Sequence, residues 1–356
     1  MGFWNWIVDL FSDEEPDPPQ PSARAGNSAV ATLDRAEGTA ATDRTGRPRP
    51  AERWWMPDGV IQADPLPMLP PSMSTEARAL ENLMVSHFDG HDLNLPAMPR
   101  VAERVLSRLR DPKSSMAKVA KDIAEDQVTA GDVLRMANSA LYRGLTKITS
   151  LQAAVTRLGA NALKTLMMHE TMRAAMFYKK GVKEELADML WRRSLASGCV
   201  MRGLAQFTAK DRDDAFLLGL LHDVGNVLVV RLMHEQRKVV KFEPDSETFE
   251  YLAFECHQEF GELIANGWGL PESLTELIAN HHKPPAADDP LATERWMLIF
   301  TDMTNQMLGY DVPNEYNLLG SRAATELAVA DRPGFEAFLA ELPEQIEDVI
   351  GSFRGA

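Results

Sequence analysis

From about Thr75 onward the chain is an almost unbroken succession of segments with helical spacing, and this feature most constrains its fold. In the segment RVAERVLSRLR, for example, apolar residues recur every three or four positions and Pro99 precedes the first of them. No segment shows the alternation of apolar and polar residues that is typical of a strand. The sequence therefore predicts an almost all-α fold.

Several helix boundaries are marked by capping residues. Ser114 and Ser115 are N-cap candidates for the segment MAKVAKDIAED, and Ser150 can cap the helix that runs through Leu158. Gly159 is expected to end that helix in a left-handed conformation. The segments differ in length and share no recurring motif, which argues against an internal repeat.

The first 73 residues have a different composition. Eleven of the 22 prolines fall before position 72, among Ser, Thr, Ala and Asp. Such a chain buries too little apolar surface to order itself, so we expect residues 1–73 to be a disordered tail. Trp4, Trp6, Trp54 and Trp55 lie there, where no core explains them. The N-terminal aromatic segment could dock into a partner groove or rest on a membrane surface, or its aromatics could be incidental.

Charge, hydropathy and cysteine content argue against nucleic-acid-binding, membrane-spanning and disulfide-rich proteins. The formal net charge is −15 and no cluster of Lys or Arg stands out, so nucleic acids are not expected partners. No uninterrupted apolar run reaches the roughly 18 residues of a membrane span. The two cysteines, Cys199 and Cys256, are too few for a disulfide framework, and Cys256 is interpreted as a packing residue. A cytoplasmic protein is the simplest interpretation.

The run FLLGLLHDVGNVLVV places His222 and Asp223 side by side in an apolar segment. Imidazole and carboxylate are suitable ligands for Zn, Fe or Mn ions, although such a pair can also simply cross-link helices. The further candidates of the same kind are His257, His281, His282 and Asp302. The remaining histidines, which lack matched partners and are expected at the surface or in packing, are His87, His91, His169 and His234.

Several segments in fixed order resemble the HD superfamily of metal-dependent phosphohydrolases. They are LWRRSLA, FLLGLLHDVGN, HQEFGELIANGWGLP, LIANHHKP and IFTDMTNQML. The upstream blocks LPAMPRVAERVLSRLRDP and DVLRMANSALYRGLTKITSLQAAVTRLGANALKTLM are similar to HDOD domains, the HD-related output domains of bacterial signalling proteins. The resemblance implies an HD-like multi-helix bundle (181–345) with an N-terminal helical subdomain (74–180), followed by a C-terminal end (346–356).

The resemblance also assigns roles. His222 and Asp223 match the paired metal ligands, Asp302 matches the terminal aspartate, and His257, His281 and His282 resemble the additional histidines of members that hold two ions. Where the first ligand histidine would stand, this chain has Arg193, and Asn226 replaces a lysine of many active relatives. A guanidinium stays charged and has no lone pair for a metal. We therefore expect Arg193 to lie between Asp223 and Asp302 as a cation that replaces the metal.

Two functions follow from the resemblance. The first is a non-catalytic signalling module that needs no cofactor and contacts sensor kinases, response regulators or cyclic-di-GMP proteins. The second is a phosphohydrolase acting on a nucleotide or cyclic dinucleotide, in which a divalent transition metal activates water and Arg193 contacts the substrate phosphate. Arg193 favours the first function, because an enzyme is expected to keep the ligand at that position.

Overall fold

The computed structural model describes residues 53–57, 60, 73–89, 95–139, 141–176, 184–242, 246–311 and 314–354. Every regular element within these ranges is a helix and none is a strand, which confirms the all-α prediction. The helices are α2 (Thr75–Asp89), α3 (Arg100–Arg110), α4 (Met116–Ala124), α5 (Gln127–Asn138), α6 (Leu151–Met176), α7 (Glu184–Thr208), α8 (Arg212–Leu221), α9 (Asn226–Val240), α10 (Ser246–Gly267), α11 (Glu272–Asn280), α12 (Ala292–Leu308), η1 (Leu318–Gly320), α13 (Arg322–Glu326) and α14 (Phe335–Arg354).

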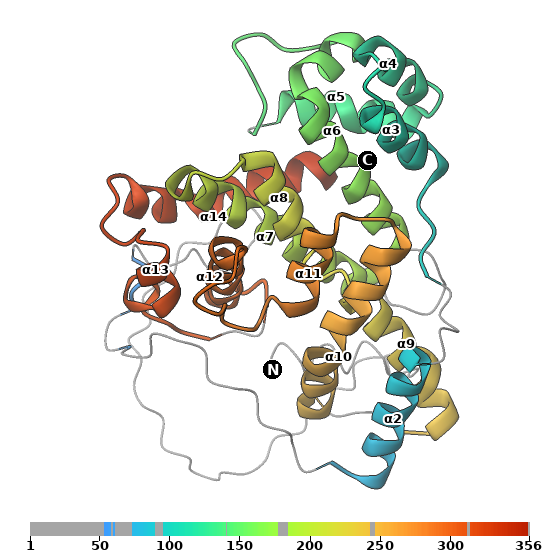
Figure 1. The fold of residues 1–356 in the computed structure, drawn as a ribbon, viewed down its shortest axis with the longest axis vertical. Helices are drawn as coiled ribbons and strands as arrows, with labels where there is room; N and C mark the ends of the chain where they lie inside the picture. The colour runs from blue at the N-terminus through green and yellow to red at the C-terminus, as the bar shows by residue number, and fades with distance from the viewer. Residues whose placement is uncertain are drawn as a thin grey trace, which may run out of the picture.

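The helices form two packed groups (Figure 1). At one end α3, α4 and α5 pack against α6, and α6 also contacts α7 and α8 of the larger group. Within the larger group α7 is central, because it contacts α8, α12 and α14. At the opposite end α2, α9 and α10 pack together. Because α7 lies at the centre of the larger group, its side chains can reach a site that is buried among the surrounding helices.

Local signals fixed several boundaries as expected. Ser115 is the N-cap of α4, and its hydroxyl accepts a backbone N–H in the first turn. The Ser150 hydroxyl accepts the N–H of Ala153 at 3.3 Å at the start of α6. Gly159 interrupts α6 with φ 71° and ψ −176°, a conformation that only glycine adopts readily. The helix is interrupted at the expected residue, but ψ −176° is not the left-handed helical conformation that was expected, and the chain resumes as a helix after the kink.

The apolar run from 216 to 230 is divided by a turn. α8 ends at Leu221, residues 222–225 form the turn, and α9 begins at Asn226. Gly225 allows the turn to lie directly on α10, because a Cβ at this position would be only 1.8 Å from the carbonyl oxygen of His257. The turn and α10 therefore approach each other so closely that only glycine fits at position 225.

Trp54 and Trp55 belong to the core, contrary to the expectation that no core explains them. They are 6% and 3% exposed, and their rings pack edge to face with centroids 5.8 Å apart. The N–H of Leu318 donates to the carbonyl of Trp55 at 2.9 Å, and Trp54 Nε1 donates to the carbonyl of Leu339 at 3.1 Å. That carbonyl needs a donor because Pro343, four residues later in α14, has no N–H. Trp4 and Trp6 lie outside the described residues.

One segment, Arg212–Gln236, is long and apolar enough by composition to cross a membrane. In its most apolar window, however, 94% of the residues are buried inside the protein. Such burial is typical of the core of a folded helical domain, and here the segment comprises α8, the turn and most of α9.

Candidate functional site

Six side chains proposed from the sequence meet in one buried cluster, and Arg193 of α7 joins them. His222 is the C-cap of α8 and His281 is the C-cap of α11, and neither has exposed surface. The other four are Asp223 in the turn after α8, His257 in α10, His282 directly after α11, and Asp302 in α12. The C-terminal ends of α8 and α11 thus meet side chains from the middle of α7, α10 and α12.

Asp223 lies at the centre of this cluster. Its Oδ2 is 2.8 Å from Nη2 of Arg193 and 3.4 Å from Nε2 of His222. Its Oδ1 is 3.4 Å from Nε2 of His281 and 3.5 Å from Nε2 of His257. Among the described residues, neither oxygen accepts a hydrogen bond of ordinary length and angle. The carboxylate is therefore stabilised chiefly by the positive charge around it.

The second partner of Arg193 differs from the expected one. Nη1 of Arg193 donates to Oδ1 of Asp311 at 2.8 Å, so the guanidinium lies between Asp223 and Asp311 and not between Asp223 and Asp302. Asp311 can reach α7 because α12 ends at Gly309, whose φ of 73° turns the chain. The guanidinium therefore joins the turn after α8 to the segment after α12.

Asp302 instead binds two histidines. Its Oδ1 accepts a hydrogen bond from Nε2 of His222 at 3.2 Å, and its Oδ2 lies 3.3 Å from Nδ1 of His282. Oδ2 is buried without a hydrogen bond of good geometry within the described part of the chain. The carboxylate thus keeps an unused acceptor that faces the histidine side of the cluster.

Backbone carbonyls orient three of the histidines. Nδ1 of His222, His257 and His281 each lies 2.8 or 2.9 Å from a carbonyl oxygen three or four residues earlier in the chain. A carbonyl can only accept, so each Nδ1 carries a proton and each Nε2 faces the cluster. Orientation of the second ring nitrogen by a backbone carbonyl is typical of metal-binding histidines.

The cluster contains two kinds of imidazole. Burial by itself lowers a histidine pKa, but the two cluster aspartates outweigh it at His222 and raise its pKa to about 9. At His281, burial and the neighbouring His282 lower the pKa to about 4, and the same causes hold the pKa of His257 well below its ordinary value. At neutral pH His222 is therefore an imidazolium, whereas His257 and His281 are neutral and keep a lone pair on Nε2.

The acidic groups are ionised. Burial tends to raise the pKa of Asp223, but the charges of Arg193 and His222 hold it well below the usual range. Burial has the same tendency at Asp302, where the hydrogen bond from His222 and the neighbouring His282 hold the pKa low.

The donor atoms fit a metal ion at one end of the cluster only. Nε2 of His257 lies 3.1 Å from Nε2 of His281 and 3.0 Å from Nε2 of His282. Lone pairs this close repel unless a proton or a cation lies between them, and transition metals accept such imidazole sets. Beside Asp223, in contrast, the Arg193 guanidinium already supplies positive charge and has no lone pair for a metal. That end does not fit an ion.

Sequence reasoning missed the residues that hold Arg193 in place. Asp311 is 5% exposed, and it follows Tyr310, whose hydroxyl donates to Oε1 of Glu347 at 2.6 Å. Arg192 donates to the same oxygen at 2.6 Å. Two adjacent arginines of α7 thus bind two adjacent residues after α12, one directly and one through Glu347. The only sequence signal was a Tyr-Asp pair directly after the glycine that ends α12.

His169 does not join the cluster. His169 is 1% exposed, accepts a hydrogen bond from Nε1 of Trp191 at 2.8 Å, and packs against Phe353 with ring centroids 4.4 Å apart. A packing role agrees with the sequence analysis. The side chains of His87 and His91 lie outside the described part of the structure.

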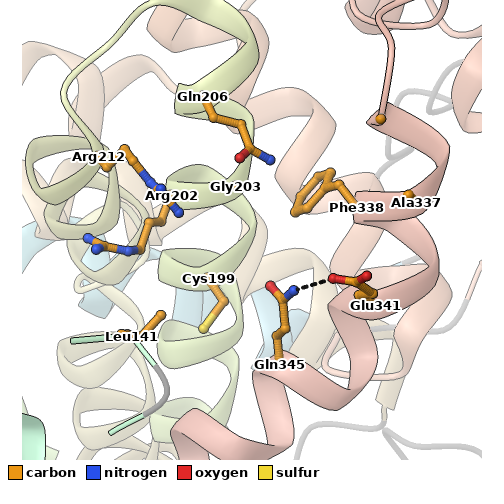
Figure 2. A pocket seen from close by; sticks show the side chains of 11 residues that line it. Leu141, Cys199, Arg202, Gly203, Gln206, Arg212, Ala337, Phe338, Glu341 and Gln345 are labelled. Atoms are coloured by element: carbon orange, nitrogen blue, oxygen red, sulfur yellow. Dashed lines mark hydrogen bonds between the residues drawn. The ribbon is translucent and has the colours of Figure 1, made fainter. Parts of the chain in front are cut away.

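A separate cavity of about 230 Å³ lies between α7 and α14 (Figure 2). Figure 2 shows Gln345 and Glu341 on its α14 side, joined by a 3.1 Å hydrogen bond. Arg202 lines the α7 side and already pairs with Asp213. Cys199 also lines it, and burial raises the pKa of this thiol to about 12, so it is not a poised nucleophile. No residue of the histidine cluster lines this cavity.

An all-α bundle whose helix ends carry a buried His-Asp pair beside further histidines and an aspartate has the architecture of the HD type. The sequence pattern of the HDOD domain matches residues 95–284, which is more than half of the 356 residues. The chain belongs to the HDOD domain family.

The chain is also similar to individual proteins. An uncharacterized protein of Treponema pallidum (strain Nichols) is 24% identical over 236 residues, covering 62% of this chain and 44% of that protein, so this chain spans less than half of that relative's length. Two crystal structures share the fold. A provisionally named metal-dependent phosphohydrolase of Shewanella amazonensis SB2B has a TM-score of 0.65 at 19% identity, covering 79% of this chain and 100% of that one. An HDOD domain protein of unknown function from Geobacter sulfurreducens has a TM-score of 0.57 at 24% identity, covering 78% and 98%.

Proposed function

We propose that this protein is a non-catalytic regulatory module of the HDOD type, which transmits a signal through contacts with other proteins. The observation that carries the proposal is the position of Arg193, whose Nη2 lies 2.8 Å from Oδ2 of Asp223. The guanidinium neutralises the aspartate that HD-type enzymes would use as a metal ligand, and Asp311 fixes it there.

The magnitude of the electrostatic conflict supports this proposal. A divalent ion about 5 Å from the guanidinium, at an effective dielectric constant near 20, would be repelled by roughly 6 kcal/mol. That energy corresponds to a loss of several decades of affinity, because each 1.4 kcal/mol is about tenfold. An enzyme that depends on two ions would lose one of them, whereas a structural module loses nothing.

The partners we propose are signalling proteins in the cytoplasm, namely sensor kinases, response regulators or cyclic-di-GMP proteins. A fold neighbour from Marinobacter aquaeolei VT8, provisionally named a signal transduction protein, has a TM-score of 0.57 at 20% identity over 78% of this chain and 66% of that one. The acidic net charge disfavours nucleic acid. We include the N-terminal aromatic segment with Trp4 and Trp6 as a candidate contact.

A second candidate function rests on the three-histidine end of the cluster. His257, His281 and His282 could hold one divalent transition metal, which would polarise a phosphate ester and activate water. The chain would then act as a phosphohydrolase on a nucleotide or cyclic dinucleotide, with His222 supplying a proton. Arg193 would have to leave Asp223 to contact a substrate phosphate, which its two 2.8 Å ion pairs oppose.

Metal analysis separates the two functions. We expect purified protein to contain well under one transition-metal ion per chain by elemental mass spectrometry, and Arg193→His to gain metal. Arg193→Lys is the matched control, because it keeps the charge and supplies no ligand at neutral pH. Stoichiometric metal in the unmodified protein, together with hydrolysis of a model phosphodiester, would overturn the regulatory proposal.

A further inference from the structure

A second cavity, of about 390 Å³, is lined by residues of the helices α7, α8, α11 and α12. Its inner wall is made of apolar side chains that are almost fully buried: Met201 and Met297 are 0% exposed, and Leu218 and Leu277 are 4% exposed. Its volume falls within the roughly 300–1,000 Å³ that is usual for small-molecule sites. Thioether side chains are flexible and suit ligands of irregular shape.

The helices that surround this cavity also carry the cluster. α7, α8, α11 and α12 line the cavity, and the same four helices or their ends supply Arg193, His222, His281 and Asp302. On α8 the connection is one turn long, because the N–H of His222 donates to the carbonyl of Leu218 at 2.9 Å. A molecule in the cavity would therefore contact four of the five elements that form the candidate site.

The rim carries the polar groups that define a ligand. Oε1 of Glu294 accepts an ion-pair hydrogen bond from Nζ of Lys210 at 2.6 Å. Oε2 of the same carboxylate is buried and has no hydrogen-bond partner among the described residues. A buried carboxylate oxygen without a donor costs free energy, and a donor on a ligand would remove that cost. Asp211 and Asp214 add negative charge to the rim, and Lys164 is the second cation.

We propose that this cavity binds a small organic amine, with its apolar body against the methionines and leucines and its ammonium group on the carboxylate of Glu294. The rim has three carboxylates and two ammonium groups, so it favours a cationic head over an anionic one. Binding does not depend on the function proposed above. The use of this site as the input of a regulatory module rests on that function.

The binding test uses the full chain and three probes of equal length: 3-phenylpropylamine, 3-phenylpropan-1-ol and 3-phenylpropionate. Affinities are measured by ligand-observed NMR titration. The amine is expected to bind more tightly than the alcohol, and the carboxylate least tightly. Glu294→Gln should weaken the amine about tenfold and leave the alcohol unchanged, because a hydrogen bond to a charged acceptor contributes more than a neutral one. Lys210→Met keeps the carboxylate and should leave amine binding at least as strong.

Two tryptophan substitutions, one on the rim of the cavity and one beside it, test whether the probes bind in the cavity. Ser273 lies exposed on the rim at the start of α11, whereas its neighbour Glu272 does not line the cavity. Ser273→Trp should abolish binding of all three probes, and Glu272→Trp should not change it. Both variants alter only surface residues, so circular dichroism should match that of the unmodified protein. No amine binding to the unmodified chain, or equal binding by both tryptophan variants, would overturn the proposed site.

The coupling to the cluster is tested separately. Saturating 3-phenylpropylamine should shift the imidazole NMR resonances of His222 and His281, and Ser273→Trp should remove the shift. Binding without any shift would overturn the role as an input while leaving the site itself in place. Metal in the unmodified protein would count against the regulatory function alone.

Discussion

The guanidinium of Arg193 and the carboxylate of Asp223 form a buried ion pair with 2.8 Å between Nη2 and Oδ2, and their side chains are 15% and 3% exposed. Arg193 binds Asp311 equally closely. Both carboxylates therefore share this cation. A buried charge that loses its partner costs far more than an exposed one, so this residue is the most sensitive point of the site.

Arg193→Met should lower the free energy of unfolding by about 3–5 kcal/mol, because it removes a cation that two buried carboxylates share. Urea unfolding followed by circular dichroism measures the change. Arg53→Met is the matched control, because Arg53 pairs with Glu336 at 3.7 Å and both side chains are 55% exposed. The control should change stability by less than about 1 kcal/mol. Equal effects of the two substitutions would contradict a structural role for the Arg193 guanidinium.

Gly225→Ala should damage the fold at the site. The added Cβ would lie 1.8 Å from the carbonyl oxygen of His257, and backbone cannot move aside as a flexible side chain can. We expect a loss of about 3 kcal/mol or more and altered histidine NMR resonances. Gly351→Ala in α14 meets nothing within 4 Å and should stabilise the protein by about 0.5–1 kcal/mol. A neutral Gly225→Ala would show that the turn does not lie against α10.

The buried thiols predict a loss of stability at alkaline pH. Burial raises the pKa of Cys199 and of Cys256 to about 12, whereas an unfolded thiol titrates near 8.5. Between these values only the unfolded chain releases the protons, so each thiol lowers the free energy of unfolding by about 1.4 kcal/mol per pH unit. Urea unfolding at pH 8 and pH 10 gives the slope. Replacing both cysteines with alanine should make the slope shallower, and an unchanged slope would contradict buried thiols.

The sequence predicted the helices well because their boundaries depend on local chemistry, as at Ser115, Ser150 and Gly159. It also named all seven side chains that meet in the cluster. Their motifs occur in the same order as in HD proteins, and this order identified residues that lie close together in the fold. Asp311 was missed because its contact with α7 depends on how the chain turns after α12. Ion pairs between distant segments leave no periodic pattern in a sequence.

Trp54 and Trp55 show the same limit at the other end of the chain. The surrounding prolines and polar residues indicated a disordered segment, and a two-residue anchor is too short to produce apolar periodicity. The carbonyl that Trp54 binds is free only because of a proline 289 positions later, at Pro343. Sequence patterns are analysed within one segment at a time, so they do not connect two positions that lie so far apart in the chain.

The link between Trp54 and Pro343 can be measured by a double-mutant cycle. Trp54→Phe removes the indole donor to Leu339 and should cost about 1 kcal/mol or more, including lost ring contacts. Pro343→Ala gives that carbonyl a helical N–H partner, so the hydrogen-bond part of the loss should shrink in its background. Trp55→Phe is the control, because its Nε1 has no hydrogen-bond partner in the described part of the chain. Trp55→Phe should lower the free energy of unfolding by the same amount with proline or alanine at position 343. If Trp54→Phe also cost the same in both backgrounds, the proline would not be the reason that this carbonyl accepts the indole.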